Sequence, residues 1–207
     1  MASLIAGMGT SHVPGLGAAM DNNKTKEPYW ATLFEGLKPI RDWHRTNVPD
    51  VNIIVYNDHA TAFSLDNYAT FTVGVGDLYQ PADEGWGPRN VPAMQGSPDL
   101  AWHIVESVMA EEFDLAVNAS MDLDHGFTVP LSIAYDQPQV WPVAVVPVCV
   151  NVIQHPLPTA LRCYKLGQAL GRAIASFPKN ITVGIWGTGG LSHQLGGEHV
   201  GVVNPEF

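Results

Sequence analysis

The sequence is poor in positive charge. Its 207 residues include 10 lysines and arginines against 20 aspartates and glutamates, which gives a formal net charge of −10. No cluster of basic residues could neutralise a run of phosphates. The composition therefore excludes nucleic acid as an expected partner.

Cysteines and long apolar runs are scarce as well. Cys149 and Cys163 are the two cysteines, and both lie in apolar or helical patterns. They favour core thiols over the disulfide framework of a secreted protein. No apolar run approaches the roughly 20 residues needed to cross a bilayer, and the first residues lack the basic segment of a secretory signal. We therefore expect a cytoplasmic protein with no membrane partner.

Short β-branched runs alternate with helical patterns along the chain. The runs at 3–9, 51–56, 143–150 and 181–186 predict buried strands. Apolar spacing predicts helices over 28–45, 97–113 and 159–177. This alternation, in a chain of single-domain length, predicts an α/β fold: a single-domain sandwich with a central mixed sheet flanked by helices. Residues 75–94, rich in Gly, Pro and charge, predict a long ordered loop of the kind that is often functional.

Histidines recur just after the expected strands. His12, His59 and His193 follow the first, second and fourth of them, and His125 follows a possible further strand near 115–119. Open α/β sheets place ligand sites outside the carboxyl ends of their strands. These four positions therefore predict a shared site, although a single histidine at a strand end is more often a structural residue.

The residue types favour metal or acid–base chemistry. Two histidines and one carboxylate leave open positions on Fe(II), and the same imidazoles suit zinc. Asp58 and Asp124 each precede a candidate histidine and could fix its orientation. The glycines at 187–190 match neither a P-loop nor a dinucleotide fingerprint, so we interpret them as a tight turn that presents His193.

Several other residues are weaker candidates. Ser11 and Ser192 stand beside histidines but lack a nucleophile-elbow pattern. We expect His44 to be solvated and His103 to pack structurally. Trp86, in the long loop, could line a pocket for an aromatic ring.

Five motifs occur in order along nearly the whole chain. They are Thr-Ser-His-Val-Pro at 10–14, Tyr-Asn-Asp-His-Ala-Thr-Ala-Phe at 56–63, Pro-Ala-Asp-Glu-Gly-Trp-Gly-Pro-Arg at 81–89, Asp-His-Gly at 124–126 and Trp-Gly-Thr-Gly-Gly-Leu-Ser-His-Gln-Leu at 186–195. Together they resemble the class III, LigB-type extradiol ring-cleavage dioxygenases, the family of the catalytic β subunits of protocatechuate 4,5-dioxygenase.

The resemblance implies an Fe(2+) enzyme. By it, His12 and His59 correspond to the iron ligands, His193 to the proton-transfer histidine and His125 to an active-site histidine near the substrate. The family's third ligand is a glutamate expected beyond residue 207. The resemblance therefore implies that residues 1–207 form a single catalytic extradiol dioxygenase domain that lacks its C-terminal portion.

The implied reaction is cleavage of a catechol-type aromatic acid with O2 beside its diol. Protocatechuate, opened to 4-carboxy-2-hydroxymuconate semialdehyde, is the leading substrate, with gallate and 3-O-methylgallate as alternatives, in aromatic catabolism that includes lignin degradation. The family also implies a small α subunit or a fused equivalent, in a homo- or hetero-oligomer such as a dimer of α–β units. A zinc-dependent hydrolase and a non-enzymatic binding protein of the same fold are the competing classes.

Overall fold

A computed structural model describes residues 1–190, 193–194 and 197–206. Its centre is a six-stranded sheet in the order β1-β8-β2-β7-β3-β6. The strands are β1 (Ser3–Thr10), β2 (Val51–Tyr56), β3 (Phe71–Gly74), β6 (Ala116–Asn118), β7 (Ala144–Val150) and β8 (Thr182–Thr188). Strands β1, β8, β2 and β7 run parallel, whereas β3 pairs antiparallel with β7. The expected mixed α/β sheet is confirmed.

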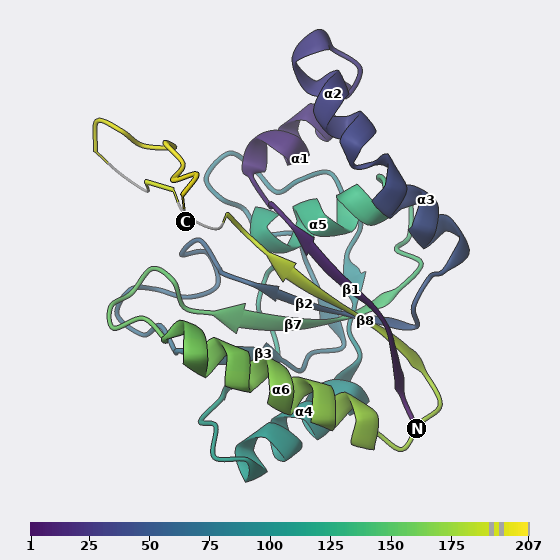
Figure 1. The fold of residues 1–207 in the computed structure, drawn as a ribbon, viewed down its shortest axis with the longest axis vertical. Helices are drawn as coiled ribbons and strands as arrows, with labels where there is room; N and C mark the ends of the chain where they lie inside the picture. Colours follow the sequence, from purple (N-terminus) through teal and green to yellow (C-terminus); the bar gives the residue numbers. More distant parts are fainter. Residues whose placement is uncertain (191–192, 195–196, 207) are drawn as a thin grey trace.

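Helices cover both faces of this sheet (Figure 1). Helices α4 (Pro98–Ala110) and α6 (Ala160–Ser176) lie on one face, and α5 (His125–Tyr135) lies on the other. Helices α1 (Pro14–Asp21), α2 (Pro28–Gly36) and α3 (Lys38–Thr46) pack outside α5. No helix among the described residues is long and apolar enough to cross a membrane.

The central strands are apolar because both of their faces are buried. In β2, Ile53 faces the core formed with α4 and α6, whereas the next residue, Ile54, faces the core formed with α5. Both side chains are fully buried. Parallel strands covered on two sides show such continuous apolar runs rather than an alternating pattern, which is why these strands could be predicted.

Two sequence expectations are corrected. The helix expected over 28–45 is split at Leu37 into α2 and α3, because Pro39 has no N–H for a continuing helix and restricts the residue before it. His44 is buried rather than solvated, at 1% exposure, and its Nδ1 donates to Ile40 O at 2.8 Å. Its ring packs against Trp186.

The stretch 75–94 is the ordered loop that was expected. It carries the short strand β4 (Leu78–Tyr79), which pairs with β5 (Met94–Gln95) at the end of the loop. A further bridge joins Pro81 to Leu123, shortly before α5. The loop is thereby brought to the edge of the sheet where β1, β2 and β8 end.

Candidate metal centre and active site

Three of the candidate histidines form one cluster. His12 follows β1, His59 follows β2, and His125 is the first residue of α5. The ring centroids of His12 and His59 are 5.2 Å apart, those of His12 and His125 5.8 Å, and those of His59 and His125 4.0 Å. The cluster forms because β1 and β2 flank β8 and end at the same edge of the sheet.

His125 reaches the cluster by a different route from the one expected. The strand β6 exists, but it runs parallel to β3 and therefore ends at the opposite edge of the sheet. The chain then returns beside residues 80–82, with hydrogen bonds to Leu123 in both directions. The N-terminus of α5, rather than a strand end, places His125.

The His12 ring is oriented by Thr188, the last residue of β8. Thr188 Oγ1 donates to Val55 O at 3.1 Å, so its oxygen accepts from His12 Nδ1 at 3.0 Å. A proton on Nδ1 leaves Nε2 with a free lone pair. His12 is thus held in the tautomer that can bind a metal.

The His59 ring is oriented by Asp124. Oδ2 of this buried carboxylate accepts from the backbone N of His59 at 2.7 Å and from its Nδ1 at 2.9 Å, and Oδ1 accepts from Gly126 N at 2.8 Å. Nε2 of His59 accepts from Asn57 Nδ2 at 3.1 Å. His59 therefore also directs an unprotonated Nε2 away from its carboxylate partner.

One of the two expected orienting carboxylates is confirmed with a different partner, and the other is not. Asp124 serves His59 rather than the adjacent His125. Asp58 bonds to no histidine; its oxygens accept from the backbone of residues 61–63 and from the Thr61 hydroxyl. Asp58 thus shapes the turn after His59.

His125 is paired with Glu84, a residue of the long loop. Glu84 Oε2 lies 2.5 Å from His125 Nδ1, and Oε1 accepts from His125 N at 2.9 Å. Both side chains are 9% exposed. The carboxylate thus holds the ring and also satisfies the first N–H of α5.

The environment separates the pKa values of the two other histidines. Burial, reinforced by the neighbouring imidazoles, lowers the pKa of His12 to about 4. Burial also acts to lower the pKa of His59, but the hydrogen bond and charge of Asp124 outweigh it and the pKa is raised. His12 is therefore a neutral ligand candidate near pH 7.

These donors fit a divalent metal. Two imidazoles on one ion, with nitrogen about 2.1 Å from the metal, have ring centroids about 4.5–5.2 Å apart, which matches the His12–His59 pair. Among the described residues, His59, Asp124 and His125 also offer ligand atoms within 4.8 Å of one another. We favour His12 and His59, because the carboxylate oxygens of Asp124 already accept three hydrogen bonds.

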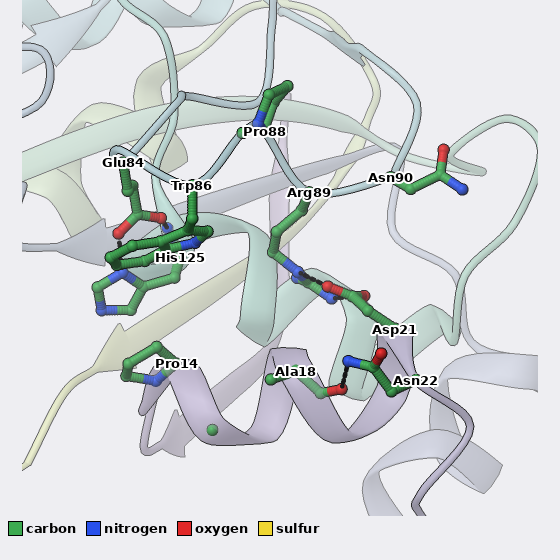
Figure 2. Close-up of a pocket in the computed structure, with 12 residues that line it drawn as sticks. Pro14, Ala18, Asp21, Asn22, Glu84, Trp86, Pro88, Arg89, Asn90 and His125 are labelled. Atoms are coloured by element: carbon green, nitrogen blue, oxygen red, sulfur yellow. Dashed lines mark hydrogen bonds and ion pairs between the residues drawn. The ribbon is translucent and has the colours of Figure 1, made fainter.

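A cavity of about 440 Å³ opens beside this cluster, a volume suited to a small ligand. Helix α1 and the long loop form its walls, and His125 lies at one end (Figure 2). Trp86, 75% exposed, lines it as expected. At the other end, Arg89 donates from Nε and Nη2 to the two oxygens of Asp21, at 3.0 and 2.8 Å.

Comparison with known proteins decides the family. The model of the family described as the catalytic LigB subunit of aromatic ring-opening dioxygenase matches residues 6–207. The chain belongs to this family.

Curated relatives of this LigB-family chain agree. It is 51% identical over 126 residues to a gallate dioxygenase of Pseudomonas putida, covering 61% of this chain and 37% of the relative. It is 31% identical over 198 residues to a 2,3-dihydroxyphenylpropionate/2,3-dihydroxicinnamic acid 1,2-dioxygenase of Photorhabdus laumondii, covering 95% and 58%. A Mycobacterium ulcerans protein of the same name is 33% identical over 184 residues, covering 89% and 55%. The chain thus spans 37% to 58% of these relatives.

The turn after β8 carries His193 in this LigB-family chain. Gly189 has a φ of 119°, and a Cβ there would lie 3.7 Å from His12 Nε2. A Cβ on Gly190 would lie 2.8 Å from the His193 ring. The side chain of His193 is exposed, and its recorded contact is Nδ1 to Gln194 O at 3.4 Å. Gly187 and Thr188 belong to β8, whereas Gly189 and Gly190 follow the strand, so the glycine turn expected at 187–190 is confirmed in part and the role of His193 stays a prediction.

The remaining candidates are structural or undescribed. Ser11 Oγ accepts from Val13 N at 3.3 Å. His103 contacts Ala173 O at 3.1 Å and packs on Phe177, as expected. Ser192, like Leu191 and Leu195 of the same motif, lies outside the described residues.

Sequence reasoning missed Glu84, Thr188 and Arg89 as residues of the LigB-family site. All three lie within the five motifs, but none is a histidine that follows a strand. For Glu84 and Arg89, the available signal was the motif at 81–89, in which an acid and an arginine stand on either side of a tryptophan. The partners of these residues are set by the tertiary fold and cannot be read from the sequence.

Proposed function

We propose that the protein cleaves the ring of a catechol-type aromatic acid beside its diol, using O2 and an Fe(2+) ion bound by His12 and His59. The observation that carries the proposal is the pairing of these imidazoles. Thr188 and Asp124 hold their Nδ1 atoms, which leaves the Nε2 atoms unprotonated in rings 5.2 Å apart. Two imidazoles and a carboxylate are a ligand set of non-haem Fe(II) oxygenases.

The third ligand is proposed to be a glutamate beyond residue 207, as the family resemblance implies. Residues 1–207 would then form a catalytic domain without its C-terminal portion. When bound, the metal would raise the acidity of the substrate hydroxyls and bring the diol and O2 together. Asn57 must release Nε2 of His59 before a metal can occupy that position, because its amide donates there.

The protein's own residues supply binding and proton transfer. We propose that His193 accepts the proton of a catechol hydroxyl, since the lone pair of a neutral imidazole nitrogen can act as a general base. His125 presents its ring to the cavity and would hydrogen-bond to the substrate. Trp86 and Pro14, which also line the cavity, would exclude water from one side of the substrate's aromatic ring.

Gallate is the substrate we place first, with protocatechuate and 3-O-methylgallate as the alternatives. The 51% identity to a protein named gallate dioxygenase supports this order. A cytoplasmic location, and an oligomer with a small α subunit or a fused equivalent, are kept as proposals from the family resemblance.

The decisive experiment is anaerobic reconstitution with Fe(II), followed by oxygen uptake and the absorbance of the ring-opened product with each of the three acids. We expect uptake coupled to product formation with at least one acid. Hydrolysis with zinc, and no uptake with iron, would instead support a zinc-dependent hydrolase that uses His12, His59 and His125 as ligands. Binding of the acids with neither reaction would support a non-enzymatic protein.

A further inference from the structure

We propose that Glu84 is a positioning residue that fixes the tautomer and the orientation of His125 for substrate binding. The inference rests on the proposed function for its kinetic consequence, whereas the tautomer itself is independent of it. Neither residue of this pair is a proposed metal ligand. Glu84 lies 41 residues before its partner in the sequence, so their pairing is a product of the fold.

The two oxygens of Glu84 have separate partners on one residue. Oε2 contacts the ring Nδ1 at 2.5 Å and Oε1 contacts the backbone N at 2.9 Å. A carboxylate with two anchors on the same residue cannot rotate without losing one of them. The ring torsion of His125 is thus tied to the backbone at the start of α5.

The contact also selects one of the two neutral forms of the ring. A carboxylate accepts hydrogen bonds, so Nδ1 of His125 carries the proton and Nε2 carries the lone pair. Figure 2 shows the second ring nitrogen on the side of the ring away from Glu84. The ring atom left to accept a hydrogen bond from a substrate hydroxyl is therefore an unprotonated Nε2.

Burial makes the pairing hard to replace by solvent. Both side chains are 9% exposed, and an unpaired polar group in such a place is costly. The negative charge also stands at the N-terminus of α5, where the helix dipole favours it. Glu84 therefore has two reasons to stay on His125 rather than to turn into water.

The loop that carries Glu84 has other anchors. Asp83 Oδ1 accepts from Gly85 N and Gly87 N, both at 2.9 Å. Arg89 forms its ion pair with Asp21 on α1. Loss of the Glu84 contact should leave the loop in place, so the effect on His125 can be separated from loop unfolding.

Asp83 supplies the matched control, because it is an acid next to Glu84 in the same loop that contacts no histidine. We would compare Glu84→Ala, Glu84→Gln and Asp83→Asn with the unchanged protein. The first readout is ¹⁵N NMR of the His125 ring in metal-free protein, which distinguishes the two tautomers. The second is kcat and KM for oxygen uptake with gallate, with bound iron and melting temperature measured alongside.

We expect Glu84→Ala to shift His125 towards the Nε2–H form and to lower turnover by about 10- to 100-fold, with iron content retained. Glu84→Gln should keep the Nδ1–H form, because its amide oxygen can still accept, and should recover most of the turnover. Asp83→Asn should change neither readout.

Two results would overturn the proposal: an unchanged tautomer in Glu84→Ala, or an equal kinetic loss in Asp83→Asn. Equal loss in the Gln and Ala variants would also count against positioning and for charge alone. If the unchanged protein consumes no oxygen with any catechol acid, the proposed function fails, and the tautomer measurement still decides the role of Glu84.

Discussion

Replacing Thr188 with valine should weaken metal binding while keeping the shape of the side chain. The hydroxyl lies between His12 Nδ1, at 3.0 Å, and Val55 O, at 3.1 Å. Removing it leaves a ring N–H without its acceptor, so the ring can rotate or change tautomer. Loss of such a partner of a metal-binding histidine typically costs about 10- to 100-fold in metal affinity. That range corresponds to about 1.4–2.7 kcal/mol.

The assay is an anaerobic Fe(II) titration against a competing chelator. Thr188→Ser is the control, because it retains the hydroxyl and should bind iron nearly as the unchanged protein does. Thr188→Val should also lose about 1–2 kcal/mol of unfolding free energy, since Val55 O loses its donor. Iron binding by the valine variant as tight as that of the unchanged protein would refute the assignment of His12 as an oriented ligand.

Four further outcomes are expected. His12→Ala and His59→Ala should each abolish stoichiometric iron binding, measured by metal analysis after desalting. His193→Ala should keep iron and lose most oxygen uptake; loss of iron instead would contradict its proton-transfer role. Gly17→Ala should lower the unfolding free energy by about 1–3 kcal/mol in urea titrations, because its new Cβ would lie 2.9 Å from Val129 Cγ2. Finally, folding lowers the pKa of His12 to about 4. The unfolding free energy of the metal-free protein should therefore fall, by at most about 3 kcal/mol, as the pH drops from about 6.5 towards 4. Urea titrations at each pH should show a smaller fall for His12→Gln.

The sequence was sufficient for the parts of the site that follow parallel strands. His12 and His59 could be paired because buried strands are recognisable as apolar runs and because parallel strands end at a common edge. The same reasoning expected glycines at the end of β8, and Gly189 and Gly190 do follow that strand. This reasoning requires only that each strand is recognised by itself and that a rule states at which edge of the sheet the strand ends.

Helix α5 could not be found in the same way. Residues 125–134 are all buried, so this part of the helix has no solvent-exposed face to produce a marked amphipathic period. Pro130 lies inside it, and an interior proline usually argues against a helix. Consequently, the sequence assigned His125 to a strand end, although the family motif had already marked the residue as important.

The sequence did not predict which histidine each orienting carboxylate contacts, because the contacting residues are far apart along the chain. Asp124 was expected to act on its neighbour, His125, but a residue next to a helix N-terminus points its side chain back over the first turn. There it meets Gly126 N and, across the cluster, His59. The position on His125 is taken by Glu84 from the loop.

The first turn of α5 therefore joins helix capping to the chemistry of the site. Asp124 caps the helix through Gly126 N and orients His59, while Glu84 bonds the first N–H and orients His125. The arrangement around Asp124 depends on Gly126, because a Cβ there would lie 2.8 Å from Asn57 O and 2.9 Å from Asp124 Oδ1. Any larger residue at this position must displace the Asp124 carboxylate or the chain beside His59. A change of stability at the start of α5 should thus be accompanied by a change at the metal site.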